Sequence, residues 1–297
     1  MSADGHDGGG RIVLCADDYA MTEGVSRSID RLAADGRLSA VSVMVTSRHW
    51  PALGERARAL RSRCAVGLHL DLTLGAPLGP MPHLAPAGRP PAIGELTARV
   101  LRGDIDREEV AAEVRRQLAA FADATGHPPD HVDGHQHAHA LPVVRDAVLA
   151  TLAGMTTTPK PLVRVPADRP AAILRRRTAV AKAMALAWLS RGFGAAVRRA
   201  GFPTNDSFAG VSSFVPGAAA AELRRAALSG GRLHMVMCHP GYPDAELAAI
   251  DPVVARRRIE HDLLMTGEAL GRPIWRPVRD ADGGAIDWRT AIGAGPS

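Results

Sequence analysis

Residues 11–19 read RIVLCADDY, a mostly apolar run that ends in two carboxylates. Such a run is typical of a strand that is buried on both faces of a parallel sheet. Helical spacing follows at once in residues 23–38, where Val25, Ile29 and Leu32 share one face and Gly36 is a stop signal. A buried strand followed by an amphipathic helix indicates an α/β fold.

The same alternation continues along the chain. Further strand-like runs are SAVSVMVTS, AVGLHLDLT, PLVRVP and RLHMVMCHPGYP, and helical runs separate them. About seven strand candidates favour a single-domain, deformed (β/α) TIM-like barrel of parallel strands with outer helices over an open sheet. We expect flexible tails at 1–10 and 291–297 around one barrel domain at 11–290.

Two long segments do not fit the simple alternation. LGAPLGPMPHLAPAGRPPAIG, residues 74–94, is dense in proline and glycine and predicts a long loop of the kind that often binds ligands. Residues 171–201 are basic and helical, and they predict two helices hinged near Gly192.

Composition narrows the classes of partner and location. The formal net charge is +5, from 36 Lys plus Arg against 31 Asp plus Glu, and the arginines are spread along the chain, so we expect no nucleic-acid partner. The start, MSADGHDGGGR, lacks the apolar core of a signal peptide. The most apolar stretch, residues 178–189, is too short for a transmembrane helix and contains Lys182. Each cysteine lies in an apolar run, which is typical of buried free thiols, and we expect a cytoplasmic protein.

Strongly polar residues follow the strand candidates at their carboxyl ends. In a parallel barrel these ends meet at one rim, where active sites are built. The residues are Asp17, Asp18, His69, Asp71, Asp133, His135, Asp206 and His239.

The richest of these segments is HVDGHQHAHALP, residues 131–142. Its four histidines and one aspartate are at odd positions, so a continuous strand would turn all five to one side. However, Leu141 and Pro142 announce a helix, which predicts a short strand ending near Gly134. His135 then lies at the strand end, and His137 and His139 fall in the loop as supporting groups.

Each remaining candidate has a structural alternative. Asp18 or Thr22 could cap the helix that follows. His69 could be an ordinary core histidine, and His239 could be a rim histidine bound to a carboxylate. Taken together, an aspartate and two histidines from three strand ends make a plausible three-ligand metal set with an open position for water, and a free carboxylate nearby can take a proton.

Four segments resemble the YdjC-like carbohydrate deacetylases. They are LCADDYAMTEGVSRSI, VGLHLDLTLGAPL, HVDGHQHAH and CHPGYPD, and the resemblance runs in order from about Arg11 to about Leu264. This family includes chitooligosaccharide deacetylases and a branch associated with hopanoid biosynthesis. The resemblance implies a deformed (β/α) barrel and metal-dependent removal of acetyl groups from N-acetylated sugars.

The resemblance also implies roles for individual residues. Asp17 matches the family's catalytic base, Asp18, His69 and His135 match its metal ligands, and His239 matches a histidine that assists as an acid. The cofactor is one divalent ion, Zn²⁺ or Mg²⁺, of which an Asp/His/His set favours Zn²⁺. We expect the substrate-binding or supporting residues to be Tyr19, Asp71, Asp133, His137, His139 and Asp206.

Two departures from the family pattern concern the substrate. Tyr19-Ala20 stands where the family commonly has phenylalanine and glycine, which could alter the substrate wall. The basic region 171–201 matches the family poorly, so the sequence leaves open which N-acetylated sugar, oligosaccharide or glycolipid binds. Because the family is often dimeric, a homodimer is an expectation.

Two alternatives stay open at this point. A metal-dependent phosphoesterase or amidohydrolase on a similar barrel would need two metals, with His137, His139 or Asp71 as further ligands. A non-enzymatic sugar- or lipid-binding protein would use the basic region 171–201 as a docking surface.

Overall fold

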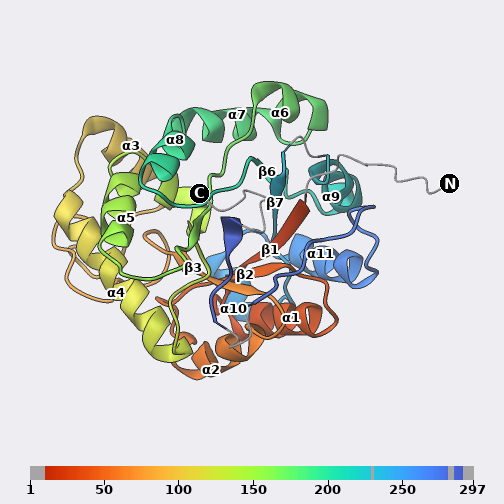
Figure 1. The fold of residues 1–297 in the computed structure, drawn as a ribbon, viewed down its shortest axis with the longest axis horizontal. Helices are drawn as coiled ribbons and strands as arrows, with labels where there is room; N and C mark the ends of the chain where they lie inside the picture. The colour runs from red at the N-terminus through yellow and green to blue at the C-terminus, as the bar shows by residue number, and fades with distance from the viewer. Residues whose placement is uncertain (1–10, 229–230, 280–283, 290–297) are drawn as a thin grey trace.

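The computed structural model describes residues 11–228, 231–279 and 284–289. The tails predicted at 1–10 and 291–297 lie outside these residues. The described chain contains a single parallel sheet of seven strands in the order β5-β4-β3-β2-β1-β7-β6, surrounded by helices (Figure 1). The strands are β1 (Arg11–Tyr19), β2 (Ala40–Val43), β3 (Ala65–Leu70), β4 (His131–Gly134), β5 (Leu162–Val163), β6 (Ser207–Ala209) and β7 (Leu233–Cys238).

The sheet curls so that its two edges approach each other. The Val163 amide of β5 donates to the Pro203 carbonyl at 2.9 Å, and the Asn205 side chain bonds to both the amide and the carbonyl of Val165. These contacts join the edges through one backbone hydrogen bond and one side chain instead of a strand ladder. The prediction of a deformed barrel of about seven parallel strands is confirmed.

The interior of the curled sheet is lined mainly by apolar side chains near the amino ends of the strands. Val13 and Cys15 of β1 face this interior, whereas Ile12 and Leu14 face the outer helices. Trp288 fills the interior, and its indole donates to the carbonyl of Asp130, directly before β4, at 2.6 Å. Polar chemistry is therefore concentrated at the carboxyl ends, as in other parallel barrels.

Most helices form the outer layer around the sheet (Figure 1). Their ends carry ordinary capping signals: Thr22 caps α1 by accepting from the Val25 amide, and Gly126 ends α4 with a φ of +74°. The helices are α1 (Glu23–Ala34), α2 (Trp50–Leu60), α3 (Ile93–Arg102), α4 (Arg107–Thr125), α5 (Val144–Ala153), α6 (Pro170–Arg176), α7 (Val180–Leu189), α8 (Phe193–Arg199), α9 (Ala219–Ala226), α10 (Ala245–Ile250) and α11 (Ala255–Met265), with short 3₁₀ segments at His135–Ala140 and Pro216–Ala218.

The basic region forms three helices, so the prediction of two was wrong. The break near Gly192 is present, with a φ of +77°. A second break lies between α6 and α7, where Arg177 and Ala179 both have positive φ. No proline or glycine marks that break in the sequence.

The proline-rich segment before α3 is a long loop, as predicted, and it is anchored on α4. Glu113 accepts from the Leu78 amide, and Glu109 accepts from the amides of His83 and Leu84. All three cysteines are buried and free, as expected. Among the described residues, no helix combines the length and apolar character needed to cross a membrane.

Candidate metal centre

The carboxyl end of β1 places two adjacent aspartates in the site. In a regular strand Asp17 and Asp18 would point to opposite faces. The pairing of β1 with β2 is irregular between Ala16 and Tyr19, and Asp18 has a φ of +70°. Such a conformation is unfavourable for most residues and is tolerated by aspartate, and it is often found at functional sites.

This irregularity also turns Tyr19 away from the site. The Tyr19 phenol is fully buried and donates to Asp30 of α1 at 3.1 Å. Tyr19 therefore forms no part of an exposed substrate wall, contrary to the expectation from the sequence. Because Thr22 caps α1, the Asp18 carboxylate is free for other partners.

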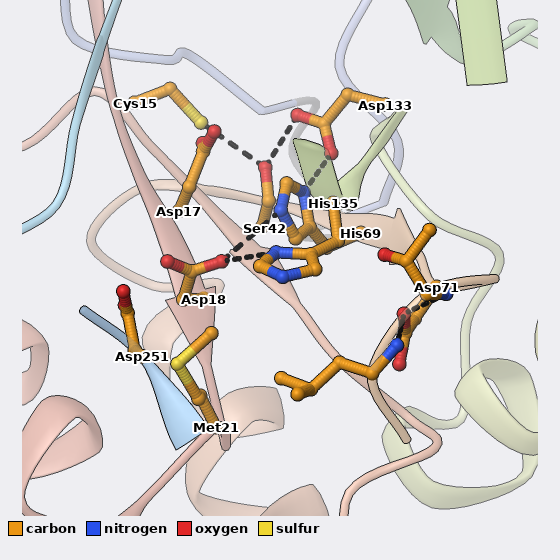
Figure 2. A network of polar contacts seen from close by, with 12 residues as sticks. Cys15, Asp17, Asp18, Met21, Ser42, His69, Asp71, Asp133, His135 and Asp251 are labelled. Carbon is orange, nitrogen blue, oxygen red and sulfur yellow. Dashed lines mark hydrogen bonds and ion pairs between the residues drawn. The ribbon is translucent and has the colours of Figure 1, made fainter. Parts of the chain in front are cut away.

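Asp18 meets two histidines from two other strand ends, as shown in Figure 2. Asp18 Oδ1 lies 3.0 Å from Nδ1 of His135 and 3.3 Å from Nε2 of His69. The three potential ligand atoms lie within 4.8 Å of one another. We call Asp18, His69 and His135 the rim cluster, and it contains the three residues that the sequence assigned to the metal.

Asp133 fixes the orientation of His69. His69 Nδ1 lies 2.6 Å from Asp133 Oδ1, while Ser42 Oγ donates to the other oxygen of Asp133 at 2.6 Å. Burial opposes ionisation of Asp133, but the charges of Arg164 and His69 outweigh it and lower the pKa of Asp133. A carboxylate at one ring nitrogen turns the other ring nitrogen of His69 toward Asp18, and the supporting role expected of Asp133 stays a prediction.

The charge of His69 depends on the same neighbours. Burial alone would lower the pKa of His69, but Asp133, Asp17 and Asp18 raise it to about 10. Both ring nitrogens then carry protons, one toward Asp133 and one toward Asp18. A metal at Asp18 would replace the second proton.

The buried charges around the rim cluster leave an excess of negative charge. Four carboxylates and two guanidinium groups form one chain of contacts through His69. They are Asp17, Asp18, Asp133, Asp251, Arg164 and Arg257. With His69 neutral, as it would be when it binds a metal, two negative charges remain, which a divalent cation would neutralise. The donor set and this charge together fit a divalent ion.

Arg164 connects Asp17 with Asp133. This guanidinium is fully buried, and its two terminal nitrogens each lie 2.7 Å from an oxygen of Asp17. One of them also lies 2.6 Å from Asp133. The paired hydrogen bonds hold the Asp17 carboxylate in a single orientation beside the rim cluster.

His239 follows β7 at the same edge of the sheet. It is half-buried, its amide donates to Glu260 at 2.7 Å, and its ring packs on Phe214 with centres 6.0 Å apart. Burial lowers the pKa of His239, and Arg257 lowers it further. The burial of His239 therefore favours its neutral form.

A second group of possible ligands lies deeper in the barrel. Cys15, His131 and Asp133, which we call the interior cluster, are all fully buried. Cys15 Sγ lies 3.7 Å from His131 Nε2, and Ser42 Oγ lies 2.9 Å from the same nitrogen. The Arg164 guanidinium touches Asp133 and opposes a cation there.

His137 and His139 do not join the rim cluster. His139 Nε2 lies 2.9 Å from the Arg164 carbonyl and therefore helps to position Arg164, which directly follows β5. His137 packs edge-on against Phe208. Burial lowers the pKa of both histidines, to about 4 for His139.

Asp71 was expected near His69, but its carboxylate bonds to the backbone of the next loop. Its oxygens accept from the amides of Thr73, Leu74 and Gly75 and from the Thr46 hydroxyl. Because β3 ends at Leu70, strand alternation does not carry Asp71 to the face of His69. Asp71 shapes the start of the proline-rich loop (Figure 2).

Asp206 lies at the opposite end of the sheet, so its placement at the rim was wrong. It directly precedes β6 and accepts from the amides of Arg232 and Leu233, where β7 begins. Asp206 joins the amino ends of two neighbouring strands.

Comparisons with known proteins agree with the resemblance seen in the sequence. The sequence profile of the YdjC-like proteins matches residues 11–271. The chain belongs to this family. A carbohydrate deacetylase of Mus musculus is 30% identical over 249 residues, 78% of each chain. Its counterpart in Homo sapiens is 32% identical over 250 residues, 78% of this chain and 75% of the relative.

A shorter match and a solved structure extend the comparison. A chitooligosaccharide deacetylase of Klebsiella pneumoniae is 32% identical over 142 residues, 47% of this chain and 54% of the relative. A crystal structure from Enterococcus faecalis V583, of a protein with a suggested role in cellobiose-phosphate cleavage, superposes with a TM-score of 0.66 and 19% identity. It covers 94% of this chain and 97% of that one, and it supports the fold.

The sequence did not reveal the two arginines of the site. Arg164 stands alone in the apolar run PLVRVP, and a charged residue in a predicted buried strand is a signal that it has a partner. Arg257 Nη2 lies 2.6 Å from Asp18 Oδ2, but Arg257 is one of three consecutive arginines on α11 and carries no such signal.

Proposed function

We propose that this protein is a metal-dependent hydrolase that removes the acetyl group from an N-acetylated sugar. The rim cluster carries the proposal, because an aspartate and two histidines converge beside a second carboxylate that is not among the three. Oxygens of Asp17 and Asp133 and a nitrogen of His69 lie within 4.8 Å of one another, so Asp17 borders the rim cluster. The carbohydrate deacetylases among its relatives support the same chemistry.

Asp18, His69 and His135 would hold the metal. When bound, a divalent ion supplies a Lewis acid that lowers the pKa of water and polarises a carbonyl oxygen. Two imidazoles and one carboxylate favour Zn²⁺, whereas an oxygen-rich set would favour Mg²⁺. Asp133 supports this assignment because it orients His69 from behind.

Asp17 would act as the general base. Its carboxylate lies beside the metal ligands, and Arg164 holds both of its oxygens. In this role Asp17 accepts the proton of the water that attacks the acetyl carbon.

His239 would act as the general acid. It lies at the same edge of the sheet as the rim cluster, directly after β7. In this role His239 gives a proton to the departing amine of the sugar, which completes cleavage of the amide bond.

The arrangement supports one ion per chain. A two-metal phosphoesterase would need further ligands such as Asp71, His137 or His139 close to the rim cluster. Instead, Asp71 bonds to backbone amides, His139 to a carbonyl, and His137 packs on a phenyl ring.

The test is acetate release from N-acetylglucosamine oligomers and N-acetylated glycolipids, measured with metal-loaded and chelator-treated protein. We expect release that is lost on chelation and restored by Zn²⁺ or another divalent ion. Full activity after complete removal of metal would contradict the proposal.

A further inference from the structure

The basic region carries a concentration of unpaired positive charge. Residues 169–199 contain seven arginines and one lysine but neither aspartate nor glutamate. Arg176 is buried against Asp168. The seven others are exposed, and no carboxylate of the described residues forms an ion pair with them: Arg169, Arg175, Arg177, Lys182, Arg191, Arg198 and Arg199.

The same region exposes apolar surface. Its central helix α7 has the sequence VAKAMALAWL, and none of its ten residues is buried. Trp188 is 60% exposed, and Leu174 of the preceding helix is 54% exposed. Figure 1 shows α6, α7 and α8 following one another along one edge of the molecule. We call the exposed side chains of residues 169–199 the α6–α8 surface.

The combination of positive charges and exposed apolar side chains on the α6–α8 surface favours one class of partner over the others. Two copies of the α6–α8 surface would repel each other across a two-fold axis, because every charge on it is positive. A nucleic acid would use the arginines but not the apolar face of α7. The boundary of an anionic bilayer uses both, since tryptophan and leucine enter the interfacial region while arginines meet the headgroups.

The α6–α8 surface also reaches the candidate active site. Lys182 Nζ lies 4.0 Å from the centre of the Phe214 ring, and Phe214 in turn packs on His239. A partner bound to α7 is therefore separated from His239 by two side chains.

We propose that the α6–α8 surface docks this protein on an anionic lipid bilayer. Trp188 and Leu174 enter the interfacial region, and the exposed arginines bind the lipid phosphates. No helix needs to cross the bilayer for this attachment, which is peripheral and sensitive to salt.

The experiment is co-sedimentation of the full chain with vesicles of phosphatidylcholine, with or without phosphatidylglycerol. We expect binding only to the vesicles with phosphatidylglycerol, and at least a tenfold loss of affinity at high salt. R175A/R191A should weaken binding by about tenfold or more, because each arginine near an anionic surface contributes about fivefold. W188A should weaken it as well, and the fluorescence of Trp188 should shift to the blue on binding.

Matched controls remove the same groups elsewhere. R102A/R107A removes two exposed arginines from α3 and α4, and L101A removes an exposed leucine that is 58% accessible. Both should bind like the wild type. Chelator-treated protein should also bind like the wild type, so failure of the proposed catalytic function would leave this result unchanged.

Several outcomes would overturn the proposal. They are absence of binding to anionic vesicles, equal binding to neutral ones, or an equal loss in R102A/R107A and R175A/R191A. Vesicle binding that W188A leaves intact, together with tight binding to duplex DNA at the same salt, would point to a polyanion site instead.

Discussion

The rim cluster and the interior cluster contain similar potential metal ligands but differ in their surroundings. Each combines an aspartate, at least one histidine and a third ligand within 4.8 Å. The interior cluster is fully buried, and Arg164 already neutralises its aspartate. His135 of the rim cluster keeps 11% of its side chain exposed, and the negative charge around Asp18 exceeds the positive charge.

The difference teaches that ligand geometry alone does not define a catalytic metal site. A catalytic ion needs ligands, an excess of negative charge around them, and access for water and substrate. In the rim cluster three potential ligands lie together, negative charge is in excess and His135 is partly exposed, whereas in the interior cluster Arg164 offsets Asp133 and every member is fully buried. The interior cluster instead supports the site, since its Asp133 orients His69.

The largest effect should come from removing a ligand of the rim cluster. H135A should lower acetate release by about a thousandfold or more, because the metal contributes several kcal/mol to transition-state stabilisation. The matched variant H139A removes a histidine of the same segment that bonds to the Arg164 carbonyl and packs on Phe193, and it should keep most of its metal and lose less activity than H135A. Equal losses of activity in H135A and H139A would contradict the assignment of His135, and not His139, to the metal.

Replacing the base should separate chemistry from metal binding. D17N should keep its metal and lose about a hundredfold to ten-thousandfold in kcat, since a positioned base contributes about that much. Steady-state kinetics and metal analysis on the same preparation provide the measurement. Full activity of D17N would exclude Asp17 as the base.

Metal affinity should rise with pH because a proton on His69 competes with the metal. The pKa of His69 is raised to about 10 without metal, so each unit of pH between 6.5 and 8.5 should tighten binding about tenfold. In the metal-free protein this raised pKa stabilises the fold fully below pH ~6.5, and the stabilisation is lost as the pH approaches 10. Zn²⁺ titration against a competing chelator measures the slope, and a flat profile would contradict the role of Asp133 and its neighbours.

Asp133 should raise the metal affinity of the rim cluster without binding the metal itself. D133N should weaken metal affinity by about tenfold to a hundredfold, the usual effect of removing a carboxylate behind a ligating histidine. It should also flatten the pH dependence, because His69 loses the partner that does most to raise its pKa. Unchanged affinity in D133N would show that His69 needs no such support.

The smallest effect should come from the interior cluster. C15A should change metal content and kcat by less than about twofold and lower the free energy of unfolding by about 1 kcal/mol, as expected for a small buried truncation. Denaturant unfolding and acetate release check these two expectations. Loss of the metal in C15A would indicate that the interior cluster, and not the rim cluster, holds the metal.

Much of the geometry of the rim cluster could be predicted because its residues lie at strand ends. Pro142 indicates that a helix begins soon after the histidine segment, which predicts a short strand ending near Gly134. The strand β4 ends there. His135 is consequently the member of that segment that meets Asp18. Parallel strands bring such ends to one rim whatever their separation in sequence.

The remaining contacts depend on packing that periodicity does not encode. Strand ends are the least certain part of such predictions, and Asp71 and Asp206 were misplaced because β3 ends early and β6 begins late. Asp18 enters the site through a backbone irregularity with positive φ, which no pattern of residues announces. Arg257 comes from a helix near the end of the chain and reaches Asp18 only in the folded barrel.

Elemental analysis of the wild type, H135A and C15A, each purified in the same metal-supplemented buffer and checked for folding by circular dichroism, tests the central claim most directly. We predict one divalent ion per chain in the wild type and in C15A, and none in H135A. Two ions in the wild type, or an ion kept by H135A and lost by C15A, would contradict a single catalytic metal held by Asp18, His69 and His135.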